Sequence, residues 1–193
     1  MNRREFNKQE TIRLIRDTFL EQYVAQGVER LSVTGLCRAC GISKSTFYLY
    51  FDDKFAVLES IEQELLSSLR EIGRDLTDVD MTEIEAGQPV EKALATLRFI
   101  RNNADKFRAL MGARGDPRFV YLWEKDIRFS FLDRFRAEQR NERSANEACI
   151  LFSSALVGYY THILFEEPQM SEREMAIILG NLLRYTLYHF DAS

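Results

Sequence analysis

The sequence is poor in the residues that mark disulfide-stabilised or metal-dependent proteins. It has three cysteines, which is too few for a disulfide framework. Cys37 and Cys40 form a C-x-x-C pair, but no second pair follows at the spacing of a zinc site. The pair is interpreted as buried structural thiols, with redox or metal chemistry as the alternative.

Histidine is scarcer still, and its scarcity bears on catalysis. The chain has two histidines, and no nucleophile–base pairing, phosphate-binding loop or metal motif accompanies them. His162 and Glu166 are four residues apart and could share a metal, but no further ligands cluster near them in the sequence. We therefore predict no enzymatic activity, no catalytic residue, no bound metal and no cofactor.

The N-terminal residues, MNRREFNKQE, contain no apolar run, which argues against a secretory signal. Hydrophobic residues make up 46% of the chain and charged residues 29%, the balance of a soluble globular protein. A length of 193 residues suits one large domain or two small domains that share a core. We expect a cytoplasmic protein.

Helical periodicity runs through almost the whole chain. Apolar residues recur every three to four positions, and the sequence has no convincing strand and no internal repeat. Helices are predicted at residues 7–27, 32–39, 43–51, 53–75, 89–103, 104–111, 117–140, 148–165 and 171–190. The acidic stretch 77–89 is predicted to be a loop. The fold class is therefore all-α.

The stretch SVTGLCRACGISKSTFYLYFDDK, residues 32–54, has the pattern of two short helices joined by a tight turn at Gly41. Its apolar residues fall at helical spacing and are expected to face inward: Val33, Leu36, Cys40, Phe47, Tyr50 and Phe51. Lys44, Ser45 and Tyr48 then share the outward face, because residues three and four apart are neighbours on a helix. A helix with an apolar back and a small, polar, cationic and aromatic front suits the major groove of DNA.

The charge distribution also points to the N-terminal part as the DNA-binding end. The net charge is −4, but residues 1–54 carry nine Lys or Arg against seven Asp or Glu, so the remainder carries −6. Lys54 falls in the first turn of a predicted helix, where the helix dipole disfavours a cation. Either an external anion such as a phosphate binds it, or it pairs with Asp52 or Asp53.

Residues 148–165 form the most apolar segment and contain no Asp, Glu, Lys or Arg. A membrane span needs about 20 apolar residues, and Ser153, Thr161 and His162 interrupt this segment. A helix that is apolar all round is otherwise buried on all sides. We expect core on one face and a second subunit on another, with Gly158 allowing close approach of a neighbouring helix.

The sequence SVTGLCRACGISKSTFYLYFDDKFAVLESI resembles the DNA-binding signature of the TetR/AcrR family of bacterial transcriptional regulators. The likeness covers Ile12 to about Ile61 and is strongest in GISKSTFYLYF and in Lys54. The segment RFIRNNADKFRALMGARGDPRF resembles, less specifically, the C-terminal domains of Gram-positive members. The resemblance implies a three-helix helix-turn-helix head at residues 1–52. It also implies a ligand-binding and dimerisation body of about six helices at 53–193, whose last two helices form a dimer.

The resemblance also assigns DNA contacts to individual positions, namely Ser32, Thr34, Lys44, Ser45, Thr46, Tyr48 and Lys54. Ser32 and Thr34 match positions near phosphates or bases, and residues 44–46 match positions that face bases. Tyr48 matches an aromatic residue that packs on DNA, and Lys54 matches a lysine that binds a phosphate.

Two positions depart from the family pattern. Thr34 is shorter than the long polar residue often found there. Leu49 stands where His, Arg or Trp is frequent, which removes an expected phosphate contact. With few long polar side chains left to read bases, we expect much of the affinity to come from phosphates and from the spacing of the dimer.

The aromatic residues of the body are candidate linings of a ligand cavity, and each also suits an ordinary core. The candidates are Phe99, Phe107, Trp123, Phe131, Tyr159, Tyr160 and His162. So many aromatic side chains favour a largely apolar or planar ligand. Arg98 or Arg101 would form an ion pair with an acidic group on the ligand; otherwise both residues face solvent. The expected dimer interface comprises Leu156, Gly158, Tyr159, Leu182 and Tyr185.

The function predicted from these features is that of a homodimeric repressor of transcription. One head alone buries too little surface and contacts too few phosphates for tight specific binding, whereas two heads can read a palindromic operator. A small, largely apolar or aromatic effector then releases the operator. The alternative is the same fold acting as an activator, or under the control of a partner protein without a small ligand.

Overall fold

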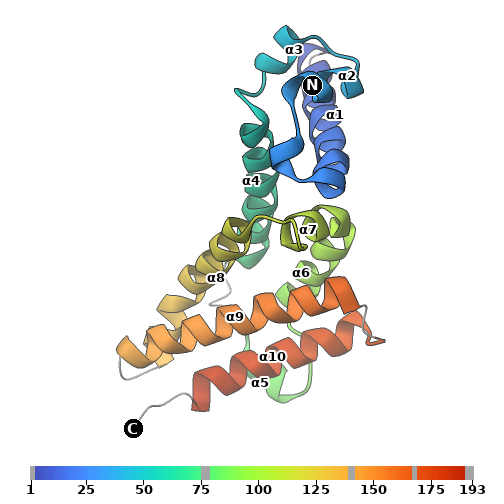
Figure 1. Cartoon of the computed structure of the whole chain (residues 1–193). Coiled ribbons are helices and arrows are strands. Elements are labelled where there is room, and N and C mark those ends of the chain that lie inside the picture. Colours follow the sequence, from blue (N-terminus) through green and yellow to red (C-terminus); the bar gives the residue numbers. More distant parts are fainter. Residues whose placement is uncertain (1–2, 75–78, 139–141, 167–168, 190–193) are drawn as a thin grey trace.

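The computed structural model describes residues 3–74, 79–138, 142–166 and 169–189. Within these ranges the chain forms ten α helices, one 3-10 helix and no strand (Figure 1). In order these are α1 (Arg3–Gln26), η1 (Val28–Arg30), α2 (Val33–Cys40), α3 (Lys44–Tyr48), α4 (Lys54–Gly73), α5 (Met81–Glu85), α6 (Glu91–Asn102), α7 (Ala104–Met111), α8 (Pro117–Glu138), α9 (Glu142–Glu166) and α10 (Glu172–His189). The all-α prediction is confirmed.

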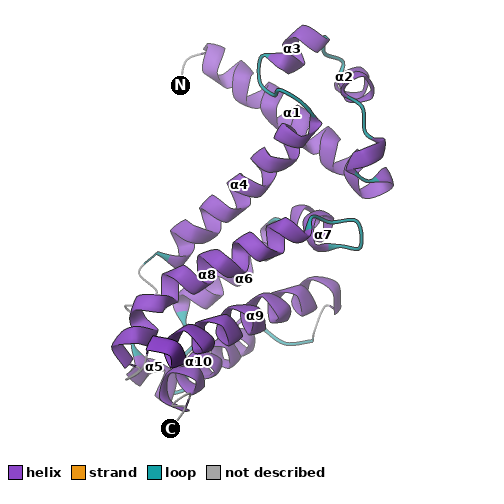
Figure 2. Ribbon diagram, turned by 60° about the vertical axis from the view of Figure 1, so that its left-hand side comes forward, coloured by secondary structure: helices purple, strands orange, loops and turns teal. Residues whose placement is uncertain are grey.

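Helices α1, α2 and α3 form a head at one end of the molecule (Figures 1 and 2). Its core is built from the apolar stripes that the sequence predicts, with Ile15, Phe19 and Phe47 all 0% exposed. The Phe47 ring contacts the ring of Phe51 at a centroid distance of 5.9 Å. This core holds α3 against the head by its apolar side, so its polar side faces outward.

Helix α4 connects the head to the remaining helices, which form the body (Figure 2). Asp53 caps it by accepting a hydrogen bond from the Ala56 N–H at 2.8 Å. Its buried residues run along its length from Val57 to Leu69, and they belong to one hydrophobic core that continues from the head into the body. Because α4 packs against α1, α6 and α8, it is shared by both parts.

In the body, α9 packs between α8 and α10, and α9 and α10 lie side by side at the end remote from the head (Figures 1 and 2). Among the described ranges, α9 is the one helix long and apolar enough to cross a membrane, and 50% of its apolar window is buried inside the chain. One side of α9 therefore belongs to the core of the body, as the sequence predicts.

The structure differs from the predicted elements in several local respects. Helix α1 begins at Arg3 rather than at residue 7, and α9 begins at Glu142 rather than at residue 148. The short helix α5, capped by Asp80, lies inside the stretch that was expected to be a loop. Helix α3 ends at Tyr48, earlier than predicted, because the chain turns there before Phe51 enters the core.

The buried faces of two helices also differ from the prediction. Helical spacing in residues 53–75 predicts that Phe55 lies on the buried stripe of α4, but it is 49% exposed. On α10, helical spacing predicts one buried stripe of Met175, Ile178 and Tyr185, yet Ile178 and Tyr185 are 41% and 62% exposed, while Leu179 and Leu183 are buried. A helix with apolar residues on several faces offers nearly equivalent stripes, and only its neighbours select one of them.

Candidate nucleic-acid interface and effector cavity

The turn between α2 and α3 has helix-turn-helix geometry. The Ser32 hydroxyl caps α2 by accepting a hydrogen bond from the Gly35 N–H at 3.0 Å. Gly41 ends α2 in the left-handed region with a φ of 66°, which glycine adopts without steric cost. The Ile42 N–H then donates to the Cys37 carbonyl at 3.0 Å. These local bonds set the direction in which α3 leaves the turn.

Ser43 orders the hydroxyl groups at the start of α3. Its hydroxyl accepts a hydrogen bond from the Thr46 N–H at 3.0 Å. It also lies 2.7 Å from the Ser45 hydroxyl and 2.8 Å from the Thr46 hydroxyl. Ser43 is not among the contact residues predicted from the sequence, although serine directly before a helix is a typical N-cap.

The predicted contact residues of α3 lie together on its outer side. Lys44, Ser45 and Tyr48 are exposed, with Tyr48 at 54%, and Thr46 is half-buried. Ser32 and Thr34 are exposed at the start of α2, and contact of these residues with DNA remains a prediction.

Leu49 follows directly after α3 and is 76% exposed. A leucine side chain cannot hydrogen-bond a phosphate, so this exposed position offers only an apolar surface. A phosphate contact from this side chain is therefore not expected.

Lys54 has partners that the sequence did not reveal. Its ammonium donates to the carbonyls of Glu29 and Leu31, each at 3.1 Å, and lies 5.2 Å from the centre of the Phe55 ring. These carbonyls, rather than Asp52 or Asp53, compensate the cation at the start of α4. Since an ammonium has three donors, a phosphate contact through the third remains a prediction.

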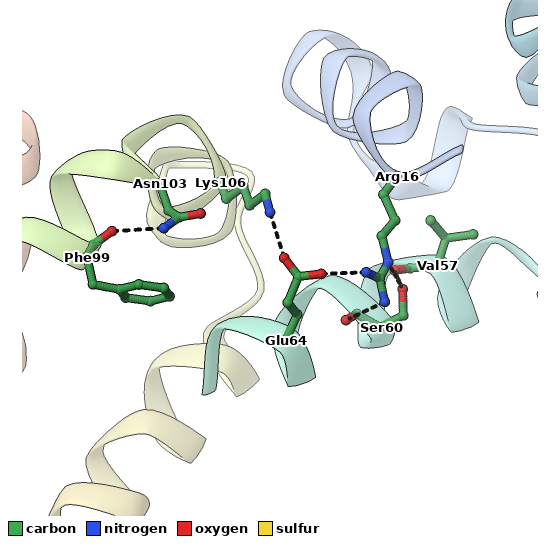
Figure 3. A network of polar contacts seen from close by, with 7 residues as sticks. All are labelled: Arg16, Val57, Ser60, Glu64, Phe99, Asn103 and Lys106. Atoms are coloured by element: carbon green, nitrogen blue, oxygen red, sulfur yellow. Dashed lines mark hydrogen bonds and ion pairs between the residues drawn. The ribbon is translucent and has the colours of Figure 1, made fainter. Parts of the chain in front are cut away.

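A polar network on α4 joins the head to the body (Figure 3). Arg16 of α1 donates to the Ser60 hydroxyl at 2.9 Å and forms an ion pair with Glu64. The other oxygen of Glu64 lies 2.8 Å from the ammonium of Lys106 on α7. One carboxylate of α4 therefore binds both parts of the molecule.

A second junction buries carboxyl groups between α1, α4 and the loop before α8. Glu62 of α4 is 3% exposed, and among the described residues its Oε1 atom has no hydrogen-bond partner. Burial, followed by the neighbouring Asp116, raises the pKa of Glu62 from 4.5 to about 7. Burial also raises the pKa of Tyr23 to about 12, with smaller effects from Asp116 and Glu62. This junction therefore favours a neutral Glu62.

The loop before α8 is also tied to the C-terminal end of α1. Arg114 donates to the carbonyl of Ala25 at 2.6 Å. Next to it, a Cβ atom on Gly115 would lie 2.0 Å from the carbonyl oxygen of Leu110. The turn between α7 and α8 therefore packs too tightly for any side chain at this position.

The body contains a cavity of about 80 Å³, counted as the space open to the centre of a water molecule. Helices α4, α6, α8, α9 and α10 contribute to its wall. Of the aromatic candidates, Trp123, Phe131 and Tyr160 line it, and the rings of Trp123 and Tyr160 stack at 5.5 Å. The buried inner end of this cavity is therefore aromatic.

The other ligand candidates lie outside this cavity. Phe107 is fully buried in an aromatic cluster with Trp123, and Phe99 stacks edge-on against Phe107. Tyr159 and His162 stack on each other on a face of α9 that does not contribute to the wall, and His162 is exposed.

Arg98 and Arg101 also lie elsewhere, paired with Glu172 at 3.4 and 3.1 Å. The charged residues that do line the cavity are Arg70, Lys92 and Asp126, none of which the sequence singled out. They lie on three different helices, so no local spacing connects them.

The residues expected at a dimer interface divide between core and surface. Leu156 is 7% exposed and lines the cavity, so within this chain it belongs to the core. Gly158 is exposed, while Tyr159 and Leu182 are half-buried. Tyr185 is 62% exposed.

Comparison with known proteins gives the same fold for the whole chain. Residues 15–61 match the family described as "Bacterial regulatory proteins, tetR family". Among curated proteins, none matches the chain in sequence.

Solved structures resemble it over nearly its full length. The dihydroxyacetone kinase operon activator DhaS has a TM-score of 0.60 at 16% identity, covering 94% of this chain and 98% of its own. The fatty acid degradation regulator FadR from Bacillus halodurans has a TM-score of 0.60 at 14% identity, covering 93% and 95%. A TetR-family regulator from Syntrophomonas wolfei has a TM-score of 0.58 at 15% identity, covering 96% and 98%. At these identities the similarity concerns the fold.

Proposed function

This chain is a transcriptional regulator of the TetR family, and we propose that it acts in the cytoplasm as a homodimeric repressor. Each subunit places α3 in one half of a palindromic operator. A small effector, largely apolar or aromatic, enters the body and lowers the affinity for the operator. Regulators of this family are transcription factors and not enzymes.

The observation that carries this proposal is the double role of α4. Its N-terminal half packs under the head, and its Glu64 binds Arg16 of α1. Further along, Leu69, Arg70 and Gly73 form part of the cavity wall. A ligand that prefers a shifted position of α4 therefore changes the position of α3, and DNA affinity falls by the ligand's differential affinity for the two arrangements.

The outer face of α9 and α10 supports a dimer. Leu151 and Phe165 of α9 are 54% and 45% exposed, and Ile178 and Tyr188 of α10 are 41% and 50% exposed. Several exposed large apolar side chains on two adjacent helices favour an interaction site. Packing against the same face of a second copy gives the two-fold symmetry that a palindrome requires.

The DNA-binding role is tested by selecting bound duplexes from genomic fragments and measuring affinity for the recovered site. Lys44→Ala and Tyr48→Ala should each weaken binding about tenfold or more, because one good base contact is worth about 1–3 kcal/mol. Lys125→Ala is the matched control, since Lys125 is exposed on α8 of the body. Unchanged affinity in both head variants would remove α3 from the interface.

The dimer is tested by sedimentation of the purified protein. Ile178→Glu and Leu151→Glu should convert it to monomers and weaken operator binding, because two like charges would face each other across the two-fold axis. Tyr121→Glu is the control, since Tyr121 is 56% exposed on α8. A monomeric wild-type protein that binds its site tightly would refute the symmetric arrangement.

A second candidate function is activation of transcription. It is favoured by the similarity to DhaS, which is named as an operon activator. Reporter expression with the operator placed upstream of a promoter separates the two. Deleting the regulator raises expression if it represses, and lowers expression if it activates.

A further inference from the structure

The cavity has a charged mouth and an aromatic inner end. Arg70 of α4 forms an ion pair with Asp126 of α8 at 2.8 Å, and their side chains are 52% and 24% exposed. In contrast, Trp123 is 2% and Tyr160 is 4% exposed. A ligand in this site therefore meets charge near solvent and apolar surface inside.

The charges at the mouth do not balance. Arg70, Lys92 and Asp126 line the cavity, which leaves an excess of one positive charge. The Lys92 ammonium donates to the carbonyl of Arg74 at the end of α4, so both cations lie next to the C-terminal part of this helix. The bond to Asp126 uses one of the five N–H donors of Arg70, and a guanidinium can bind a carboxylate through two parallel bonds.

From this arrangement we infer that the effector is a compact apolar monoanion, a carboxylate with an aromatic or short aliphatic tail. Its carboxylate binds Arg70 and Lys92 at the mouth, and its tail packs between Trp123 and Phe131. The small volume limits the tail, and the positive excess disfavours amines. The inference rests on the proposed function, in that the cavity is taken to be the effector site.

Binding of such an anion also explains how the effector acts on α4. The ligand carboxylate shares the Arg70 guanidinium with Asp126 and so weakens the α4–α8 ion pair. The same helix holds the head through Glu64 and Arg16. The anion therefore acts on the element that positions the DNA-binding end.

The experiment uses Trp123, which is the chain's single tryptophan and lines the cavity. Fluorescence titrations of the full-length protein compare phenylacetate, 2-phenylethanol and 2-phenylethylamine, and then hexanoate, hexanol and hexylamine. Each set keeps the number of carbon atoms constant and changes the polar group from carboxylate to hydroxyl to ammonium. The acids should bind roughly tenfold tighter than the alcohols, and the amines weakest, because a charge-assisted hydrogen bond is the stronger kind.

Two variants separate the charge effect from packing. Arg70→Gln should weaken acid binding roughly tenfold or more and leave alcohol binding unchanged. Asp126→Asn should strengthen acid binding, because it removes the competing carboxylate. Arg74→Gln is the control, since Arg74 pairs with Glu71 at 2.6 Å and does not line the cavity.

Equal binding of acids and alcohols, no response to acids at millimolar concentration, or acid binding unaffected by Arg70→Gln would each overturn the inference. Operator affinity is measured separately in the same samples. Acids that bind at Trp123 without releasing DNA leave the ligand class standing and refute the release mechanism. Release of DNA by a neutral or cationic ligand would refute the ligand class inferred here and would leave only the broader proposal of a small effector standing.

Discussion

Glu62 gives the sharpest prediction for the stability of this protein. Its carboxyl group lies in the junction between head and body, near Tyr23, Asp116, Arg118 and Glu59. The pKa of Glu62 is about 7 in the folded protein against 4.5 ordinarily. Between these two pH values the folded state therefore keeps a proton that the unfolded state has released. By linkage, the free energy of unfolding falls as pH rises from about 4.5 to 7.

The magnitude follows from the size of the shift. One pKa unit corresponds to about 1.4 kcal/mol. The shift of Glu62 therefore lowers the free energy of unfolding by about 3 kcal/mol as the pH rises through this range. Glu62→Gln keeps the shape of the side chain and cannot ionise. The variant should match the wild type at pH 5 and should be more stable by up to about 3 kcal/mol at pH 8.

The assay is urea unfolding of both proteins at pH 5, 6, 7 and 8, with the difference in the free energy of unfolding plotted against pH. The difference cancels other titrating groups that the two proteins share. Glu71→Gln is the control, because Glu71 is exposed on the same helix and pairs with Arg74, away from Glu62. A difference that does not change with pH, or that favours the wild type at pH 8, would refute a neutral buried Glu62.

Further predictions concern the turn before α8, the core of the head, and the Glu64 ion pairs that join the head to the body. Gly115→Ala should destabilise the protein by several kcal/mol in denaturant titrations, because its Cβ would lie 2.0 Å from the Leu110 carbonyl oxygen. Phe47→Ala should cost about 3–5 kcal/mol in the same assay, since the ring is 0% exposed in the core beneath α3. Glu64→Gln should change stability by less than about 1 kcal/mol, because its ion pairs are partly exposed. It should reduce the ligand-induced loss of operator affinity, whereas Glu71→Gln at the exposed end of α4 should not.

Local signals in the sequence determined the helices and the DNA-binding motif. Ser32 caps α2 and Gly41 ends it with a positive φ, and both act within one or two helical turns. Phe47 and Phe51 face inward because their spacing matches the helical period. Such features depend on neighbouring residues alone, so the sequence suffices to predict them.

Tertiary structure decided the features that depend on distant segments. Lys54 binds carbonyls of the segment before α2, and Arg70 meets Asp126 across two helices; neither pairing follows from spacing along the chain. Glu62 has Asp116 of the loop before α8 as a neighbour, and spacing along the chain does not predict that neighbour. The exposed face of α10, with Ile178 outward, was likewise chosen among similar apolar stripes by the helices packed against it.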